Sequence, residues 1–302
     1  MADASSIRAR STRPSGRVPR RAGASALLTA PTILSIVVLG AYPLLFVLAA
    51  AFTDSTLGRP FQEWVGTANL ETILSDADVV ASFARTVVYA VVVAVASVVL
   101  GVAIAVALER ATRSGAVVRT LLLLPLITPP VVVGTLWKLV FNPGGGLLAT
   151  VLPGISLAPL STTAWALPAI GLADVWQWTP LIVILVYAAL LAQDASVREA
   201  ASLDGAHGIG LFRNITWPAI AGTVLAALFI RLVVALKVFD LVFVMTSGGP
   251  GQASTVTTYL IQQVALKEFD IGRASAITIV FAVIVTAVTL VVAVLARKAR
   301  HD

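Results

Sequence analysis

Residues 199–218 read EAASLDGAHGIGLFRNITWP, a polar segment of small and charged residues between two long apolar runs. Ser196 and Glu199 fit a capping box, in which the serine hydroxyl and the glutamate carboxylate satisfy the first amides of a helix. Gly205 suits the end of that helix, because glycine readily adopts the backbone conformation that turns the chain. Pro218 suits the first turn of the next helix, where its missing amide costs nothing. The segment is therefore predicted to be a short helix followed by a sharp turn.

The chain around this segment is far more apolar than a soluble protein. Of its 302 residues, 58% are hydrophobic and 12% are charged, and the mean hydropathy is +0.96. Several uncharged runs exceed the ~20 residues that a helix needs to cross the hydrocarbon layer, and they lack the alternation of a membrane β-barrel. We predict an all-α membrane protein with about six transmembrane helices, at residues 25–52, 82–108, 117–140, 164–191, 218–244 and 274–297.

The basic residues between these spans set the expected orientation. One side receives most of them: Arg8, Arg10, Arg13, Arg17, Arg20, Arg21, Arg110, Arg113, Arg119, Arg198, Arg213, Arg297, Lys298 and Arg300. The other side receives Arg59, Lys267 and Arg273. Because cytoplasmic loops carry the excess of Lys and Arg, both termini are expected to be cytoplasmic.

The same pattern sets the expected boundaries of the chain's parts. Residues 1–24, rich in Arg, Ser and Pro, are expected to form a disordered cytoplasmic tail. Residues 25–297 are expected to form one transmembrane domain that contains the loop 193–218. Residues 298–302 are expected to form a short cytoplasmic tail.

Composition excludes several classes of function. Cysteine is absent and only two histidines are present, so the chain lacks the residues for a disulfide or a thiolate metal site. Membrane topology explains the net charge of +6 better than nucleic-acid binding does, because no aromatic residues are interleaved with the arginines. The glycine-rich stretch 247–251 is not followed by the Lys-Ser/Thr pair of a phosphate-binding loop. No catalytic constellation is visible, and we expect neither an enzyme nor a chain that binds ATP.

The polar segment resembles the EAA loop of the permease subunits of bacterial binding-protein-dependent ABC importers, the MetI-like superfamily. The family pattern is EAA, three residues, Gly, nine residues, Ile, two residues and Pro. The matching residues here are Glu199, Ala200, Ala201, Gly205, Ile215 and Pro218. The resemblance implies a type I ABC importer permease fold, in which this loop is a cytoplasmic coupling helix seated in a cleft of a separate ATPase subunit. Glu199 and Asp204 are then expected to contact that subunit.

Two further stretches resemble the sugar-type branch of this family, which imports maltose-like sugars, other oligosaccharides and glycerol phosphates. They are residues 174–180, DVWQWTP, and the outer segment that runs from Phe239-Asp240 through Thr246–Pro250 to residues 274–276. The resemblance implies half of a pathway for a carbohydrate or related polar solute in the bacterial cytoplasmic membrane. The implied partners are a second homologous permease subunit, two ATPase subunits that bind ATP and Mg²⁺, and an extracytoplasmic solute-binding protein. No cofactor is expected on this chain.

Charged residues inside the predicted spans mark either a pathway or a structural pair, because an unpaired charge in hydrocarbon is costly. The fifth span carries Arg231, Lys237 and Asp240, of which the last two are three residues apart and can pair on one helical face. Both a structural ion pair and a polar lining for the solute remain open. With Asp174, Trp176 and Gln177 of the fourth span, these residues are the candidates for the substrate path. Trp176 is equally consistent with a role in packing or at the membrane interface.

Two other classes of protein compete with this interpretation. One is a secondary transporter driven by a proton or sodium gradient, with Asp174 or Asp240 as the ion site. The EAA-loop pattern has no purpose in such a protein. The other is a membrane scaffold without transport, which leaves the charges of the fifth span unexplained.

Overall fold

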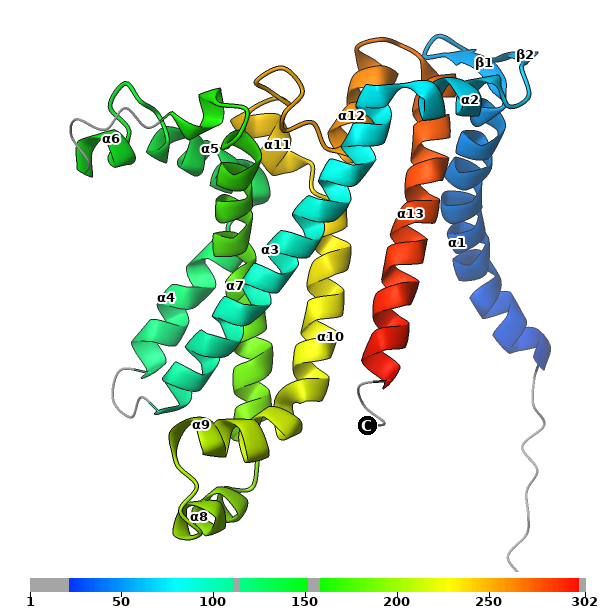
Figure 1. The fold of residues 1–302 in the computed structure, drawn as a ribbon. Helices are drawn as coiled ribbons and strands as arrows, with labels where there is room; N and C mark the ends of the chain where they lie inside the picture. Colours follow the sequence, from blue (N-terminus) through cyan, green and yellow to red (C-terminus); the bar gives the residue numbers. More distant parts are fainter. Residues whose placement is uncertain (1–21, 111–114, 152–157, 299–302) are drawn as a thin grey trace, which may run out of the picture. The chain divides into compact units, whose positions relative to one another are not determined.

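The computed structural model describes residues 22–110, 115–151 and 158–298, and most of them are helical (Figure 1). The chain divides into two compact units, residues 1–46 and 47–302. Helix α1 (Ala22–Ala51) crosses the boundary between them. Residues 1–21 and 299–302, which contain most of the two predicted tails, lie outside the described residues.

The predicted membrane helices are present. Among the described residues, five helical stretches are long and apolar enough to span a membrane, and a bent pair of helices raises the number to as many as six. The single stretches lie in α1, α3 (Ala77–Arg110), α7 (Ala166–Leu191), the stretch Gly208–Leu236 that ends with α10 (Trp217–Leu236), and α13 (Ile271–Lys298). The prediction of an all-α membrane fold with about six spanning helices is confirmed.

Two of the predicted spans are not continuous. The span predicted at 117–140 is the bent pair, α4 (Gly115–Ile127) and α5 (Pro130–Val140), whose axes meet at 103°. Pro129 and Pro130 cause this break, because proline lacks an amide and biases the preceding residue away from the helix. The span predicted at 218–244 also breaks, between the end of α10 at Leu236 and the start of α11 (Asp240–Met245). No proline marks this second break.

Helices α3, α7 and α10 form the centre of the second unit and cross one another closely (Figure 1). Small residues allow this approach: a Cβ atom added at Gly101 of α3 would lie 2.6 Å from the Cβ of Ile182 of α7. The buried cluster between these helices includes Ala90, Ala94 and Ala173. Close van der Waals packing of small residues is the main attraction between helices in a membrane, where lipid tails are as apolar as the helices.

The shorter elements lie at the two ends of the second unit (Figure 1). At one end are β1 (Thr53–Thr56), β2 (Arg59–Trp64), α2 (Ala68–Ser75) and α12 (Thr257–Leu266), and at the other are α8 (Ala195–Leu203) and α9 (Gly208–Leu211). The strands form a small antiparallel sheet that was not predicted from the sequence. The chain also forms the one-turn helix α6 (Leu147–Val151), a 3₁₀ turn (Pro159–Ser161) and a π-helix (Phe212–Thr216).

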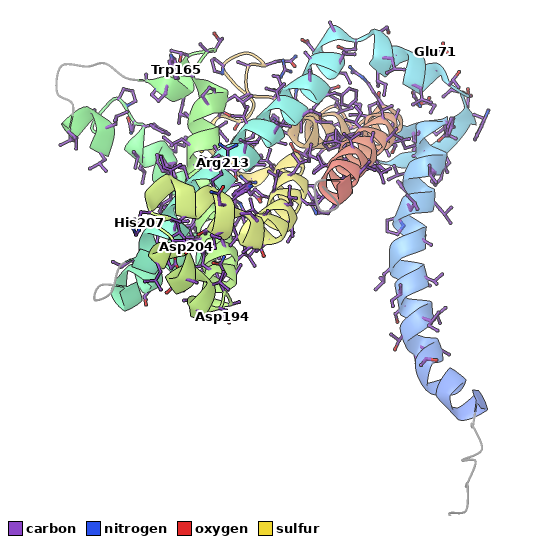
Figure 2. All side chains as sticks on the ribbon, turned by 60° about the horizontal axis from the view of Figure 1, so that its bottom comes forward. Glu71, Trp165, Asp194, Asp204, His207 and Arg213 are labelled. Atoms are coloured by element: carbon purple, nitrogen blue, oxygen red, sulfur yellow. The ribbon has the colours of Figure 1, made fainter. Side chains whose placement is uncertain are left out.

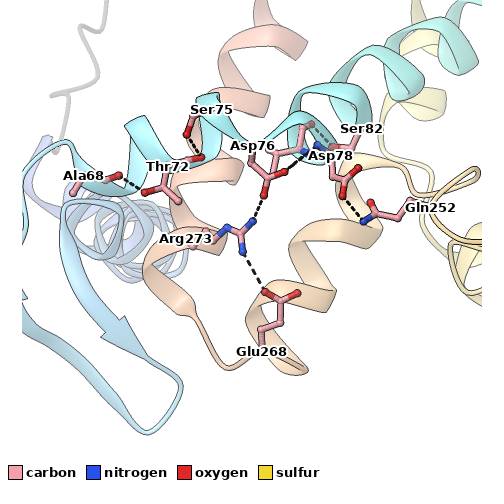
Figure 3. Close-up of polar contacts among 10 residues, drawn as sticks. Ala68, Thr72, Ser75, Asp76, Asp78, Ser82, Gln252, Glu268 and Arg273 are labelled. Atoms are coloured by element: carbon pink, nitrogen blue, oxygen red, sulfur yellow. Dashed lines mark hydrogen bonds and ion pairs between the residues drawn. The ribbon is translucent and has the colours of Figure 1, made fainter.

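A polar network ties together the helix ends on the side of the strands (Figure 3). Arg273, in the first turn of α13, pairs with Asp76, which lies between α2 and α3. Its Nη1 lies 3.4 Å from a carboxylate oxygen of Glu268. Nearby, the Gln252 amide donates a 2.8 Å hydrogen bond to Asp78. The network therefore joins the corner between α2 and α3 to the corner between α12 and α13.

We expect Arg273→Gln to lower the melting temperature of the purified protein by about 2–4 °C. A partly exposed ion pair of this kind contributes about 1 kcal/mol, which corresponds to a shift of that size. Arg59→Gln is the matched control, because Arg59 is exposed and forms no ion pair with any described residue. Equal melting temperatures for the two variants would show that the network contributes nothing measurable.

Candidate functional site

The helix in the polar loop is capped by a different residue from the one that the sequence predicts. Helix α8 begins at Ala195, and a carboxylate oxygen of Asp194 accepts a 2.9 Å hydrogen bond from the amide of Ser196. Ser196 is therefore inside the first turn, and the predicted serine cap is wrong. A carboxylate bonds the first amides more strongly than a hydroxyl does, because its charge assists the hydrogen bond.

The cap also changes the acidity of Asp194. Hydrogen bonds from the backbone and side chain of Ser196 hold the pKa of the Asp194 carboxyl below its usual value. A carboxyl whose pKa is lower in the folded state stabilises that state above its ordinary range of titration. This contribution to α8 is lost as the pH falls through the lowered pKa.

Helix α8 ends in a turn that favours glycine. The amide of Asp204 donates to the carbonyl of Ala200 at 3.1 Å, and the amide of Ala206 donates to the carbonyl of Ala201 at 2.9 Å. Between them Gly205 has a φ of 85°, in the left-handed region. This pattern is a Schellman motif, which satisfies the last carbonyls of the helix and reverses the chain. It separates α8 from α9 and sets the direction of both.

The α8–α9 surface, defined as Val197, Ala200, Leu203, Asp204 and Ile209, is solvent-exposed. Leu203 is 88% exposed and Ile209 is 84% exposed. The exposed polar residues of the same loop include Asp194, Asp204, His207 and Arg213 (Figure 2). Glu199 lies within α8. Large apolar side chains held in the open on a polar loop are typical of a surface that binds another protein.

Ile215 and Pro218 lie on either side of the first residue of α10. Ile215 belongs to the π-helix, and Pro218 is the second residue of α10. The sequence places Pro218 in the first turn of a new helix, but the residues before it are already helical. The wider π turn accommodates a proline that has no amide to donate.

The buried charges of α7 and α10 pair with each other. Arg231 of α10 is fully buried, and its Nη2 lies 2.9 Å from Oδ2 of Asp174 on α7. The Tyr89 hydroxyl donates to the same carboxylate oxygen at 2.9 Å, and Arg231 Nε donates to the Ser97 hydroxyl at 3.2 Å. The two terminal nitrogens of Arg231 form no aligned hydrogen bond with any described residue, so the contact with Asp174 is an ion pair. This network joins α3, α7 and α10.

The pair that the spacing of Lys237 and Asp240 allows is not formed within the described part of this chain. Neither residue forms an ion pair with any described residue. The helix break between them is the physical reason, because Lys237 follows the end of α10 and Asp240 starts α11. The spacing of three residues places side chains on one face only within a continuous helix.

Both helix breaks meet at one small cavity of about 90 Å³. Its polar lining residues are Asp174, Gln177, Lys237 and Asp240, and its apolar walls include Pro130 and Trp178. Gln177 Nε2 donates a 3.0 Å hydrogen bond to the carbonyl of Thr128, in the first break. The Thr258 hydroxyl donates to the carbonyl of Val238, in the second break. Side chains thus satisfy the backbone groups that each break frees, as the membrane interior requires.

Of the predicted path residues, Trp176 lies outside this cavity. It is 40% exposed, and its ring packs edge-on against Trp137 of α5, with 6.0 Å between centroids. Arg231 does not line the cavity either, but lies 5.9 Å from the ring of Trp178, which does. Asp174, Gln177, Lys237 and Asp240 are brought together.

Comparison with known proteins identifies the family. A family model described as "Binding-protein-dependent transport system inner membrane component" matches residues 97–301. The chain belongs to this family. This permease is therefore a multi-pass inner-membrane transport component, and the family is not a family of enzymes.

Two curated relatives cover most of the permease. It is 30% identical over 270 residues to the sn-glycerol-3-phosphate transport system permease protein UgpA of Agrobacterium fabrum, covering 87% of this chain and 91% of the relative. It is 33% identical over 236 residues to the trehalose/maltose transport system permease protein MalF of Thermococcus litoralis, covering 77% and 79%.

Two solved structures share the fold. A bacterial ABC transporter involved in the import of the acidic polysaccharide alginate matches with a TM-score of 0.81 and 22% identity, covering 92% of this chain and 96% of the other. The alginate transporter in complex with an alginate pentasaccharide-bound periplasmic protein matches equally well, with 21% identity and coverage of 93% and 96%. The predicted type I importer permease fold is confirmed.

Three parts of the permease's polar interior were not predicted from the sequence: Tyr89, Ser97 and the carbonyl of Thr128. A tyrosine within an apolar span is a signal, because a buried hydroxyl needs a partner. The Pro129-Pro130 pair also signals a break and therefore a free carbonyl. Nothing in the sequence indicates which carboxylate Arg231 meets, because the two residues belong to different helices.

Proposed function

We propose that this permease forms half of the translocation path of an ATP-driven importer for a carbohydrate or related polar solute. The other half comes from a second, homologous permease subunit. The names of the relatives support the solute class, because they are transport systems for trehalose and maltose, for glycerol 3-phosphate and for alginate. All of these solutes carry at least two hydroxyl groups.

The observation that carries this proposal is the exposed α8–α9 surface, at the end of the second unit opposite the strands (Figure 1). Two ATPase subunits, which bind ATP and Mg²⁺, supply the energy, and one of them receives Glu199, Ala200, Ala201 and Asp204 of this loop. Gly205, Ile215 and Pro218 fix the direction in which the loop presents them. Movement of the ATPase is transmitted along the continuous helical stretch from Gly208 to Leu236.

The direction of transport follows from the orientation of the chain. The basic residues support cytoplasmic placement of both termini and of the α8–α9 surface. The strands and α12 then face outward, where an extracytoplasmic solute-binding protein delivers the solute. One of the related structures holds such a periplasmic protein loaded with a pentasaccharide.

The cavity between the two helix breaks is the proposed solute position in this half of the path. Lys237 provides a donor, and Asp240 provides an acceptor, and neither is engaged in an ion pair with a described residue. Broken helices that expose polar groups near the middle of a membrane are a recurrent way to build a solute site. Asp174 contributes mainly through Arg231 and Tyr89, which already occupy its carboxylate.

The competing function is transport driven by an ion gradient, with Asp174 or Asp240 as the ion site. The ion pair with Arg231 makes Asp174 a poor candidate, because a carboxylate that binds and releases an ion must be free to change partner. Only Asp240 keeps this role open, and an uncoupler of the ion gradient tests it.

The test is reconstitution of the complete assembly in proteoliposomes with ¹⁴C-labelled maltose, trehalose and glycerol 3-phosphate as probes. The assembly contains this permease, its partner permease, the ATPase and the loaded solute-binding protein. We expect uptake of at least one probe that requires ATP and persists with an uncoupler. ATP-independent uptake by the lone chain, or uptake of none of the probes, would overturn the proposal.

A further inference from the structure

Gln177 lines the cavity with a side-chain amide of which only the NH₂ group is hydrogen-bonded. Its side chain is buried, with 2% of the residue exposed. Nε2 donates to the Thr128 carbonyl, whereas Oε1 has no hydrogen-bond partner among the described residues. A buried amide oxygen without a partner is costly and is rare in native proteins. Because Gln177 lines a polar cavity, its oxygen can take a partner from a molecule bound there.

The orientation of this amide is fixed by its one bond. The Thr128 carbonyl can only accept a hydrogen bond, so the NH₂ group of Gln177 must face it and Oε1 must face away. Thr128 is the last residue before the Pro129-Pro130 pair, so its carbonyl is held at the break between α4 and α5. Gln177 thus presents a pre-oriented acceptor in a wall of the cavity. Pre-orientation lowers the entropic cost of binding.

We propose that Gln177 Oε1 accepts a hydrogen bond from a hydroxyl group of the solute, and that this bond selects solutes that present a donor at this point. The inference rests on the proposed function of the cavity. Asp240 is a second acceptor in the same lining, and Lys237 is the donor. The hydroxyl-bearing side of the solute therefore faces Gln177 and Asp240.

The cavity must widen before a sugar can enter. Its volume of about 90 Å³ is close to that of about three water molecules. Its walls come from both helix breaks, and the helices beyond the breaks pack on each other: Lys138 Nζ of α5 donates a 3.1 Å hydrogen bond to the carbonyl of Val244 in α11. A Cβ added at Gly134 of α5 would lie 3.1 Å from the Val244 Cβ, so this contact is close.

Gln177 therefore bonds the break between α4 and α5, about which α5 would move when the cavity widens. Outward movement of α5 with α11 shifts the Thr128 carbonyl away from α7, which carries Gln177. A solute hydroxyl that reaches Oε1 at that moment gives the amide the partner that it lacks in the narrow state. Binding of the solute and widening of the cavity are thus expected to favour each other.

The test compares Gln177→Met with the wild type in the complete assembly, with labelled maltose, trehalose and glycerol 3-phosphate as probes. Methionine keeps the length of the side chain but supplies no amide. We expect the maximal rate of uptake to fall about tenfold, with little change in the half-saturating concentration, which the solute-binding protein sets. Gln262→Met is the matched control, because Gln262 on α12 also has an amide oxygen without a partner but lies outside this cavity. Its uptake should stay within twofold of the wild type.

Monodeoxy analogues of the imported probe distinguish a contact with solute from a purely structural role. For the analogue that lacks the hydroxyl bound by Gln177, the wild type should lose about tenfold in rate and Gln177→Met should lose nothing further. The inference would be overturned if, for every analogue, the loss of rate from the substitution multiplied with the loss from the missing hydroxyl. Normal uptake by Gln177→Met would also overturn it. Failure of the wild type to import any probe would instead overturn the proposed function.

Discussion

Gly205→Val should abolish solute uptake by the assembled importer while ATP hydrolysis continues. Gly205 has a φ of 85°, and a β-branched residue is a genuine outlier in that region. The strain is about 1–3 kcal/mol, enough to redirect the turn after α8. The α8–α9 surface would then meet the ATPase at the wrong angle, and nucleotide-driven movement would no longer reach the membrane helices. Uptake and ATPase activity are measured on the same proteoliposomes.

Gly205→Asn is the matched control for this prediction. A Cβ at this position has no atom within 4 Å, so both substitutions place a side chain in open space. Asparagine tolerates the left-handed conformation far better than valine does. We expect the asparagine variant to retain most of the uptake and both variants to insert normally. Equal loss in the two variants would show that bulk at the interface, rather than the backbone of the turn, causes the defect.

The sequence was sufficient to predict features that depend on local pattern. The membrane spans follow from runs of apolar residues, and the turn after α8 follows from Gly205 in a polar segment. Even so, the cap of α8 was assigned to Ser196, because the capping-box pattern outweighed Asp194, which stands one residue before the helix. These two candidate cap residues lie two positions apart, and only the backbone decides between them.

The breaks and pairings of the interior could not be predicted in the same way. The break after Leu236 has no proline, and tertiary contacts maintain it: the Thr258 hydroxyl bonds the Val238 carbonyl. Once that break exists, Lys237 and Asp240 are no longer on one helical face. The partner of Arg231 is likewise set by how α7 and α10 cross. The spacing of residues along the chain does not predict that crossing.

Arg231→Met is expected to be the most destabilising substitution in the membrane interior. It leaves Asp174, which is 3% exposed, with a buried charge and only the Tyr89 hydroxyl as a partner. Removing one member of a buried ion pair costs about 3–5 kcal/mol. We expect the melting temperature of the purified protein to fall by roughly 10 °C, together with loss of protein from the membrane fraction.

The double variant Arg231→Met with Asp174→Asn separates the loss of the pair from the loss of the arginine. Asparagine removes the uncompensated charge and can still accept from Tyr89, so most of the stability should return. Lys237→Met is the second comparison, because Lys237 is an exposed cation beyond the end of the same helix without an ion pair to any described residue. It should leave the melting temperature unchanged but lower uptake. If Lys237→Met destabilised the protein as much as Arg231→Met, the division between a structural pair and a solute-facing cation would be wrong.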